Sequence, residues 1–376
     1  MKIAIICDQI GGGGAFREIK SLAKVFDAHI YAGRGINSES TITNEDFKTL
    51  NIKRILGKMH RSGLVTILYT IYKFRNISIK ENYDLYIFIG NHCIGLADKL
   101  KPNIWYCNTP DRGLYLGKEN PNERSIKARI FNILFFKFFY NYDQYYAKRF
   151  NIIIAISNTV RERIFKAYGK NDMFNKEIKI IYPPVDVKQF KWKEQGDYYL
   201  STARIAPYKR VSLIVEAFKK MPDKKLIVIS TGPQLEDIKK SIKGYSNIVL
   251  QGRVTDKELK ELIGNCIATI YMPYEEDFGI SPIEGMAAGK PCIGVEEGGL
   301  RETIIHNKTG YLCPSNPKVD DLIKAVEFMS TSKALIMRKD CEEWSKKFSK
   351  EVFIERMSKL INKIYLENKN NKHKNI

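Results

Sequence analysis

The stretch ATIYMPYEEDFGISPIEGMAAGKPCIGV, residues 268–295, carries the pattern that decides the fold. It opens with a short apolar run, 268–272, and closes with a second one, 291–295. Between the two runs lie a polar loop and a segment that we expect to be helical from about Ser281. Two strands joined through a helix run parallel, because a crossover of this length returns the chain to the same edge of the sheet. The stretch therefore predicts a parallel sheet of the α/β class.

The same alternation of strands and helices extends over the chain, so we expect two doubly wound, Rossmann-like sheets. Further strands are expected at 3–7, 28–31, 84–89, 104–107, 152–156 and 178–181, and then at 198–203, 226–229 and 248–250. Pro183 and Pro184 interrupt regular structure in the charged segment 182–197, which we interpret as a linker. Because ligands bind beyond the carboxyl ends of parallel strands, the two sheets are expected to face a shared cleft.

The domain boundaries follow from this pattern. We expect an N-terminal domain over residues 1–182, a C-terminal domain over 183–350, a last helix over 351–368 and a disordered tail over 369–376. Before that last helix, two others are expected at 319–329 and 333–348. Phe353, Met357, Leu360 and Ile364 would share one face of the last helix.

Composition excludes several classes of protein. The chain has 376 residues, enough for about two domains, and 44% of them are hydrophobic. No run of about 18 apolar residues occurs, which argues against a membrane-spanning helix. Asp8 and a glycine loop follow the first apolar run where a cleavage site would be needed, so we predict a strand rather than a signal peptide and a cytoplasmic protein. The 7 cysteines form no CxxC pair, which argues against a structural zinc site or a disulfide scaffold.

Positive charge is concentrated in the N-terminal half. The formal net charge is +20. Residues 1–182 have 29 basic and 16 acidic side chains, a difference of +13, whereas 183–350 have 27 and 23, a difference of +4, and the last 26 residues 6 and 3. We therefore expect an anionic partner to meet the N-terminal half.

A glycine loop follows the first strand, in DQIGGGGAFREI at 8–19. We expect a helix from about Ala15, whose free backbone N–H groups could bind an anion. The dinucleotide-binding fingerprint is not met, because Phe16 stands where its third glycine would be. A tight turn that needs glycine only for its backbone conformation explains the loop equally well.

Two glutamates stand out in the opening stretch, Glu276 in the loop and Glu284 in the helix. A carboxylate accepts hydrogen bonds from sugar or ribose hydroxyls, and the free amides at a helix start suit a phosphate. The pattern favours a ligand that carries both groups.

Many further blocks resemble the retaining glycosyltransferases of family 4, most closely their mannosyltransferase-like branch. The blocks are GGGGAFREI (11–19), YCNTPDR (106–112), IIIAISNTVRERIFKAYG (152–169), IIYPPVD (180–186), TARIAPYKR (202–210), TGP (231–233), QGRVTDKEL (251–259), the segment with Glu276 and Glu284, and GGLRET (298–303). They cover nearly the whole chain in the order of the family. The resemblance implies the GT-B fold, with the last helix packing back on the N-terminal domain.

The resemblance also implies roles for individual residues. Arg204 and Lys209 would bind the donor diphosphate, which fits the stabilisation of a departing diphosphate by placed cations. Glu276 would contact the donor sugar and Glu284 the ribose. The other residues expected at the donor are Phe278, Gly279, Ile280, Gly13, Gly14, Arg253, Val254 and Gly232.

One residue departs from the family. Asn108 stands where the family usually has histidine near the donor sugar, and asparagine carries no proton charge near neutral pH. His92, after an expected strand, is an alternative on the sugar side, and Arg112 is a further candidate there. A catalytically silent subunit that binds a nucleotide sugar is therefore a competing hypothesis.

Two mechanisms are compatible with retention of the anomeric configuration. In a double displacement Glu276 would be the nucleophile. In a front-face reaction the diphosphate takes the acceptor proton, and we favour this because the resemblance implies that Glu276 contacts hydroxyls. No DxD motif is found, so we expect neither a divalent metal nor any other cofactor.

The expected donor is a nucleotide sugar, with mannose from GDP-mannose preferred and a UDP-sugar as the alternative. The expected acceptor is a glycan or a polyprenyl-linked molecule in surface polysaccharide synthesis.

Segment 53–75, with Lys58, Arg61 and Lys73, predicts a basic amphipathic helix, and segment 125–150 is also basic and aromatic. We hypothesise that the first segment contacts an anionic membrane at its cytoplasmic face. Nucleic acid is disfavoured as a partner because no RNA- or DNA-binding motif accompanies the charge.

Overall fold

The computed structural model describes residues 1–10, 14–34, 50, 52–54, 64–115, 126–169 and 176–374. The chain divides into two compact units. The first unit consists of residues 1–183 and 353–376, and the second of residues 184–352.

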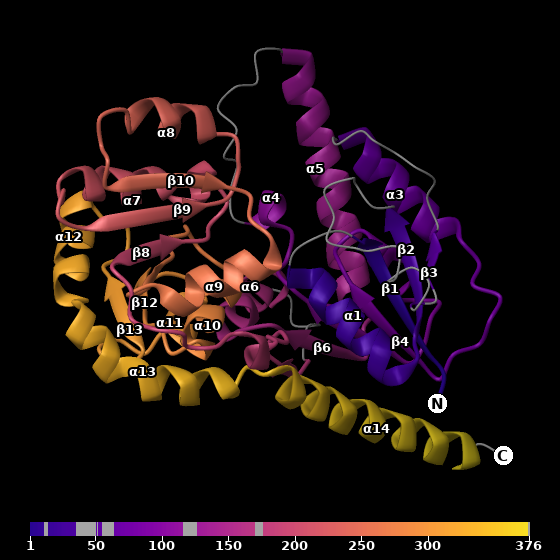
Figure 1. The fold of residues 1–376 in the computed structure, drawn as a ribbon. Helices are drawn as coiled ribbons and strands as arrows, with labels where there is room; N and C mark the ends of the chain where they lie inside the picture. Colours follow the sequence, from indigo (N-terminus) through magenta and orange to yellow (C-terminus); the bar gives the residue numbers. More distant parts are fainter. Residues whose placement is uncertain are drawn as a thin grey trace. The chain divides into compact units, whose positions relative to one another are not determined.

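The first unit is built on a parallel sheet of seven strands in the order β3-β2-β1-β4-β5-β6-β7 (Figure 1). The strands are β1 (Ile3–Gln9), β2 (His29–Arg34), β3 (Ile52–Arg54), β4 (Leu85–Ile89), β5 (Asn103–Cys107), β6 (Ile152–Ala155) and β7 (Ile178–Ile180). Its helices are α1 (Gly14–Phe26), α3 (Leu64–Asn76), the 3₁₀ helix η1 (Cys93–Leu96), α4 (Arg112–Tyr115), α5 (Ile126–Ala147), α6 (Asn158–Tyr168) and most of α14 (Lys350–Lys374). The strand order reverses between β1 and β4, where α/β sheets usually bind ligands.

The second unit has a parallel sheet of six strands in the order β10-β9-β8-β11-β12-β13. Its strands are β8 (Tyr198–Ser201), β9 (Lys225–Ile229), β10 (Ile248–Gly252), β11 (Thr269–Ile270), β12 (Cys292–Val295) and β13 (Gly310–Cys313). Its helices are η2 (Val187–Gln189), η3 (Pro207–Lys209), α7 (Val211–Lys219), α8 (Leu235–Ser241), α9 (Asp256–Asn265), α10 (Ile280–Ala287), α11 (Leu300–Thr303), α12 (Val319–Phe328) and α13 (Thr331–Lys346).

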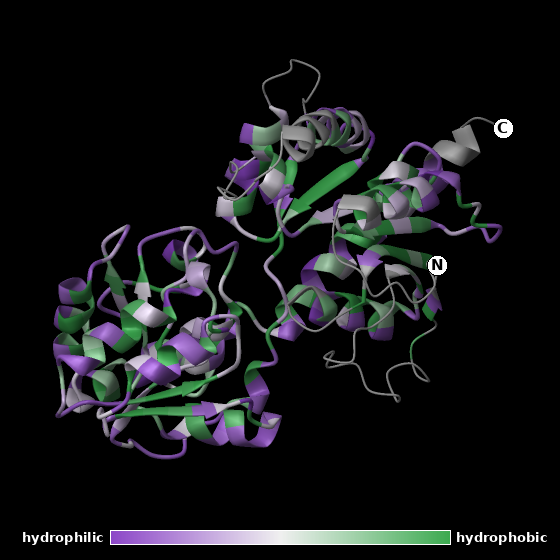
Figure 2. Cartoon of the chain, turned by 90° about the horizontal axis from the view of Figure 1, so that it is seen from above, coloured by the Kyte–Doolittle hydropathy of each residue, from purple (hydrophilic) through white to green (hydrophobic). Residues whose placement is uncertain are grey.

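Burial follows from this layered arrangement. Every residue of β4 and β5 is buried, as expected for central strands of a parallel sheet covered on both faces. Figure 2 shows the strands largely in the hydrophobic colour, while hydrophilic residues gather on helices and loops. The fold class predicted from the sequence, two Rossmann-like parallel sheets, is confirmed.

The structure corrects the expected elements at four places. The strands β3 and β13 were not expected, because each is short and neither has a long apolar run. Strand β11 is shorter than the apolar run 268–272. Helix α14 continues to Lys374, so most of the tail expected to be disordered is helical. No glycine or proline occurs in 350–376 to stop it.

The last helix belongs to the first unit from Phe353 onward. The expected apolar face, Phe353, Met357, Leu360 and Ile364, is buried. The Phe353 ring lies 6.0 Å from the ring of Tyr106, at an edge-to-face angle. Packing of this helix on the N-terminal sheet, expected from the resemblance, is therefore confirmed.

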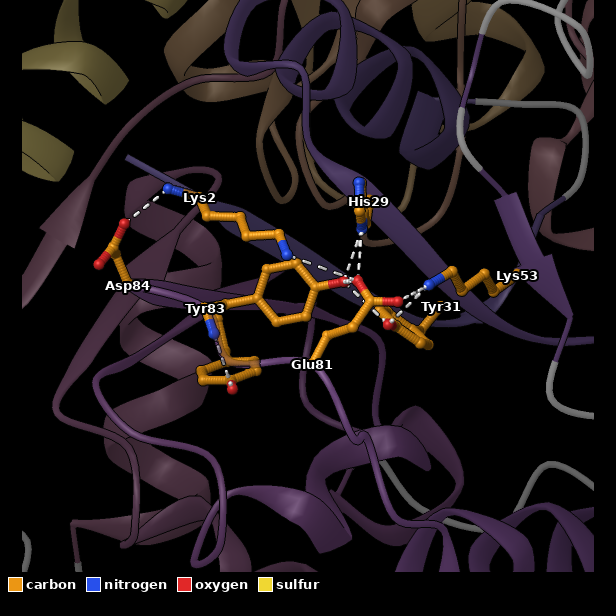
Figure 3. Close-up of polar contacts among 8 residues, drawn as sticks. Lys2, His29, Tyr31, Lys53, Glu81, Tyr83 and Asp84 are labelled. Atoms are coloured by element: carbon orange, nitrogen blue, oxygen red, sulfur yellow. Dashed lines mark hydrogen bonds and ion pairs between the residues drawn. The ribbon is translucent and has the colours of Figure 1, made fainter.

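A polar cluster joins the amino ends of β1 to β4 around Glu81 (Figure 3). Its carboxylate accepts a 2.6 Å hydrogen bond from the Tyr83 hydroxyl, lies 3.1 Å from Nδ1 of His29 and 3.8 Å from Nζ of Lys2, and pairs with Lys53. Hydrogen bonding from Lys53, followed by that from Tyr83, lowers the pKa of Glu81 to about 2. The cluster lies at the edge opposite to the carboxyl ends of the strands, so we interpret it as structural.

No helix within the described ranges is long and apolar enough to cross a membrane.

Candidate functional site

Three side chains meet beyond the carboxyl ends of β8 and β11. Lys209 ends η3, after β8, and its Nζ lies 2.5 Å from Oε2 of Glu276. The hydroxyl of Tyr271, directly after β11, accepts a 2.8 Å hydrogen bond from Lys209 and donates a 3.0 Å bond to Glu276. The two residues expected to bind diphosphate and sugar are therefore in direct contact, with a tyrosine that the sequence did not indicate.

This cluster, Lys209, Tyr271 and Glu276, is mostly shielded from water. The side chains of Lys209 and Glu276 are 15% and 20% exposed. Burial, followed by the nearby Glu276 carboxylate, raises the pKa of Tyr271 well above its usual value. Its hydroxyl therefore stays protonated and acts as a neutral hydrogen-bond donor. Partial burial also strengthens the ion pair relative to an exposed one.

Glycines fix the loop that carries Glu276. Gly298 has a φ of +53°, and a Cβ there would lie 2.2 Å from the carbonyl oxygen of Glu276. Gly299 donates its N–H to the same carbonyl at 2.8 Å. The GGLRET block therefore lets the backbone of 298–299 pack against the loop 276–278, where any side chain would collide.

A glycine precedes helix α10, and no side chain caps its start. Gly279, at φ +95°, precedes the first helical residue, Ile280. The Phe278 side chain is buried and its ring lies 5.6 Å from that of Phe348. A role for the amides of 278–280 stays a prediction. Glu284 is buried at 5% exposure and lies close enough to raise the pKa of Tyr271.

A second ion pair, between Arg210 and Glu297, supports the loop that carries Glu276. Arg210 Nη1 lies 3.1 Å from Oε1 of Glu297, which is 4% exposed. Glu297 also accepts backbone hydrogen bonds from Asn316 at 2.7 Å and from Glu275 at 3.3 Å. The sequence did not single out this pair, because nothing in its spacing distinguishes it from surface charges.

The remaining residues predicted at the donor follow neighbouring strands. Arg204 is exposed after β8, and Arg253 is exposed after β10, where Val254 packs on the apolar core beside β8. Gly232, after β9, packs so closely that a Cβ would lie 2.1 Å from the carbonyl of Ile205. Each of these positions is at the carboxyl edge of the sheet, and within the described part of the chain none of them forms a hydrogen bond or ion pair with the Lys209 cluster.

In the first unit, Asp8 organises the carboxyl edge. It accepts the backbone N–H groups of Asn91 at 2.7 Å, His92 at 3.0 Å and Cys93 at 2.6 Å. Burial alone would raise its pKa, but His92 and the backbone hydrogen bonds lower the pKa of Asp8 to about 2. Gly90 is required behind it, because a Cβ there would lie 2.4 Å from the carboxyl carbon.

The predicted sugar-side residues occupy this same edge. His92 places Nδ1 3.4 Å from Asp8 and packs its ring on Phe139, so its ring faces the carboxylate. Arg112 begins α4. Asn108 directly follows β5 and is partly exposed, and its side chain hydrogen-bonds to Glu18 of α1.

Glu18 was not indicated by the sequence, since a glutamate on an amphipathic helix is usually solvated. It is 2% exposed, and burial, opposed by the hydrogen bond from Asn108, raises its pKa to about 8.

Helix α1 begins at Gly14, close to the expected start, and Gly13 lies outside the described residues. Among the residues that the structure describes, no cluster of three His, Cys, Asp or Glu side chains could hold a metal ion.

The chain is similar to known glycosyltransferases. Residues 184–348 match the family model of glycosyl transferases group 1. An uncharacterised glycosyltransferase of Methanocaldococcus jannaschii is 28% identical over 81% of each chain. The alpha-1,3/1,6-mannosyltransferase ALG2 of Dictyostelium discoideum is 42% identical, over 24% of this chain and 22% of its own length. The match thus spans about a fifth of that relative.

Solved structures show the same fold. The Thermosynechococcus elongatus sucrose-phosphate synthase superposes with a TM-score of 0.77 at 16% identity, covering 98% of this chain and 100% of that one. Anabaena HepE, solved with UDP and glucose, superposes with a TM-score of 0.72 at 15% identity, covering 96% and 99%.

The two Rossmann-like units and these neighbours show that the chain has the GT-B fold. Within this fold, residues 184–348 are similar to the group 1 glycosyl transferases. The resemblance inferred from the sequence is confirmed.

Proposed function

We propose that this chain transfers a hexose from a nucleotide sugar to a glycan or lipid-linked acceptor, with retention at the anomeric carbon. The observation that carries the proposal is the contact of Lys209, Tyr271 and Glu276 at the carboxyl edge of the second unit's sheet. A cation and a carboxylate placed together in a partly buried position suit a ligand that joins a diphosphate to a sugar.

Mannose from GDP-mannose is the preferred donor. Support comes from relatives named as mannosyltransferases, namely ALG2 and the Salmonella typhimurium O-antigen chain mannosyltransferase RfbU, 27% identical over 46% of this chain. The RfbU name also supports an acceptor in surface polysaccharide synthesis. A UDP-sugar is the alternative, supported by the UDP and glucose bound to HepE, a structure of the same fold.

The proposed chemistry is a front-face displacement. The acceptor oxygen forms its bond to the anomeric carbon on the face from which the diphosphate leaves. The bond between that carbon and the diphosphate oxygen breaks with its electron pair, and the acceptor proton passes to a diphosphate oxygen. Lys209 and Arg204 stabilise the developing negative charge. Glu276 orients a sugar hydroxyl, Glu284 binds the ribose, and the amides of 278–280 bind the phosphate. This chemistry requires no metal or other cofactor.

We further propose a peripheral contact between α3 and an anionic membrane that carries the acceptor. Tyr69 and Tyr72 are 37% and 62% exposed on α3, and its last turn carries Lys73 and Arg75. Each basic residue near an anionic surface contributes about 1 kcal/mol, and tyrosines favour the interface. Lys58 and Arg61, expected on the same surface, lie outside the described residues. The cytoplasmic location remains a prediction.

The test begins with binding. Thermal shifts of the purified chain are measured with GDP-mannose, GDP, UDP-glucose and UDP, since a ligand at 100 times its dissociation constant stabilises by about 2.7 kcal/mol. We expect one nucleotide series to raise the melting temperature. Lys209→Met should abolish the shift, whereas Lys220→Met, which removes a lysine 60% exposed on the same unit, should preserve it. No shift with any of these nucleotides would contradict the proposal.

Turnover then separates the enzyme from a silent subunit, the alternative suggested by Asn108. Released nucleotide is quantified with and without EDTA, and the anomeric configuration of the product is read by NMR. We expect turnover that EDTA does not inhibit and a retained configuration. A covalent glycosyl adduct trapped on Glu276 would overturn the front-face mechanism, and nucleotide-sugar binding without any turnover would favour the silent subunit.

A further inference from the structure

One buried carboxylate ties together the loops that follow four neighbouring strands. In the sheet of the second unit, β8, β11, β12 and β13 lie side by side in that order. Glu297 follows β12 and is 4% exposed. Its Oε1 lies 3.1 Å from Nη1 of Arg210, after β8, and accepts the backbone N–H of Asn316, after β13, at 2.7 Å. Its Oε2 accepts the backbone N–H of Glu275, after β11, at 3.3 Å.

The three residues that Glu297 binds share an uncommon backbone conformation. Among the described residues of the second unit, four residues other than glycine have a positive φ, namely Arg210 at +51°, Glu275 at +47°, Asn307 at +60° and Asn316 at +53°. Three of these four are the partners of Glu297. Asparagine adopts this conformation readily, but arginine and glutamate rarely do. Such residues persist where the surrounding structure holds them, and they cluster at functional sites.

Two of the held residues are neighbours of the ion pair that carries the proposed function. Arg210 directly follows Lys209, and Glu275 directly precedes Glu276. The backbone angles of a residue set the direction in which the next side chain leaves the main chain. A change at either held residue would therefore move one member of the pair, and a misplacement of about 1 Å can lower a rate by roughly 100-fold.

Stability alone does not account for a glutamate at position 297. The attraction within a buried ion pair barely repays the cost of desolvation, so apolar side chains in the same place are often as stable. An apolar side chain would not accept hydrogen bonds from three separate loops, whereas a carboxylate has room for all three. The structural consequence of Glu297 is therefore a fixed geometry of these loops.

We propose that Glu297 is a positioning residue that fixes the separation of Lys209 and Glu276 by holding the residue next to each of them. The proposal rests on the proposed function, in which a diphosphate binds Lys209 and a sugar binds Glu276. The direct ion pair is then exchanged for contacts with the donor, so it no longer sets the two positions. The bonds of Glu297 involve neither of these side chains, and a bound donor leaves them in place.

Donor kinetics provide the first test. Glu297→Gln keeps the shape of the side chain but replaces one carboxylate oxygen by an NH₂ group, so at least one hydrogen bond is lost. We expect kcat/KM for the donor to fall at least about tenfold in Glu297→Gln and in Arg210→Met, whereas Arg210→Lys, which keeps the charge, should stay within about threefold of wild type. The double variant Arg210→Met/Glu297→Gln should lose less than about twofold beyond either single variant. Losses that multiply would show that the two residues act independently, which contradicts the proposal.

A matched control separates positioning from a general loss of stability. Tyr199 of β8 is 1% exposed, and its hydroxyl donates a 2.8 Å hydrogen bond to the carbonyl of Met329. Tyr199→Phe removes this bond and should lower the urea midpoint, but kcat/KM should stay within about twofold of wild type. Equal losses of kcat/KM in Tyr199→Phe and Glu297→Gln would overturn the proposal, because Glu297 would then act through stability alone.

A second measurement uses no donor, so it decides the proposal even if no nucleotide sugar is a substrate. Urea unfolding of Lys209→Met, Glu276→Gln and the double variant gives the coupling between Lys209 and Glu276. We expect this coupling to fall by at least about half when the cycle is repeated with Glu297→Gln, and to be unchanged with Tyr199→Phe. A coupling that is absent from wild type, or that Glu297→Gln leaves intact, would be decisive against the proposal. A coupling that falls as expected in a chain that binds no donor would count only against the proposed function.

Discussion

Tyr271 explains how Lys209 and Glu276 can be preorganised before a ligand arrives. The hydroxyl lies 2.8 Å from Lys209 and 3.0 Å from Glu276. In the proposed function a diphosphate binds Lys209 and a sugar binds Glu276, and this hydroxyl would then keep a hydrogen bond to either side chain. It therefore reduces the cost of separating a partly buried ion pair.

The first prediction concerns this hydroxyl. Tyr271→Phe should raise the KM for the donor and lower kcat/KM roughly tenfold, because one hydrogen bond of about 1–1.5 kcal/mol is lost. Steady-state kinetics over donor concentration provide the measurement. Tyr245→Phe, at a position 39% exposed, is the control and should leave both constants unchanged. An unaltered KM in Tyr271→Phe would show that the hydroxyl has no part in donor binding.

The second prediction concerns pH and Glu18. Its pKa is raised from 4.5 to about 8 in the folded chain. Its contribution to stability is therefore complete below pH 4.5 and is lost progressively as the pH rises to about 8. Glu18→Gln removes this loss, so the variant should be more stable than wild type by on the order of 3 kcal/mol at pH 7. Urea unfolding at pH 5 and pH 8 checks this, and an equal difference at both values would be evidence against the shifted pKa.

At the level of single residues, spacing and resemblance indicated Lys209 and Glu276, which the fold brings into contact. They did not indicate Tyr271 or Glu18. Tyr271 follows an apolar strand and has the pattern of a core residue, and Glu18 has the pattern of a solvated helix position. Their roles depend on which side chains the fold places opposite them, and a single sequence does not contain that information.

Among the elements, the loop over 276–278 depends on glycines for its shape. Gly298→Ala forces a side chain onto φ +53° and places its Cβ 2.2 Å from a carbonyl oxygen. We expect a loss of at least about 2 kcal/mol in stability and weaker donor binding, because the carbonyl belongs to Glu276. Gly252→Ala is a matched control, since Gly252 has φ +72° but nothing within 4 Å. It should cost about 1 kcal/mol without affecting the donor. Equal effects of the two substitutions on stability and donor binding would show that close packing at Gly298 does not hold the loop 276–278 in place.

The cluster around Glu81 ties the starts of four strands and gives a second pH dependence (Figure 3). Its pKa is lowered from 4.5 to about 2, so its stabilisation is present above pH 4.5 and is lost as the pH falls through about 2. Glu81→Gln should lower the urea midpoint at pH 7, and the difference from wild type should shrink towards pH 2. Because the side chain is 36% exposed, salt should weaken the effect. Glu162→Gln, at an exposed position, should show neither change.

Elements with long apolar runs were predicted well, because a strand buried on both faces must be apolar throughout. Strand β3 could not be recognised, since only three residues, one apolar and two basic, form it. Strand β13 begins with glycine and pairs only with β12, at the edge of the sheet. Short edge strands depend on their neighbours for backbone hydrogen bonds rather than on their own pattern.

For the whole molecule, the division into two units shows where the excess of positive charge lies. Residues 183–350 have 27 basic and 23 acidic side chains, nearly balanced, although the proposed diphosphate site is there. The proposed site would therefore rely on a few placed cations such as Lys209 rather than on a general positive field. The surplus of positive charge belongs to the first unit, which agrees with the proposed contact between that unit and an anionic membrane that carries the acceptor.

The chain passes from the first unit into the second at residue 184 and returns at 353. The returning helix buries Phe353, Met357, Leu360, Ile361 and Ile364. At about 1.5–3 kcal/mol for each buried side chain, this face contributes roughly 8–15 kcal/mol, an upper bound that is comparable to the whole stability of a typical domain.

Shortening the chain to residues 1–350 should therefore unfold the first unit but leave the second folded. Limited proteolysis followed by mass spectrometry should find a persistent fragment near 184–350 and rapid digestion of residues 1–183. A chain of residues 1–368 keeps the apolar face and should resist digestion in both units. Equal resistance of the two shortened chains would show that the first unit folds without its C-terminal helix.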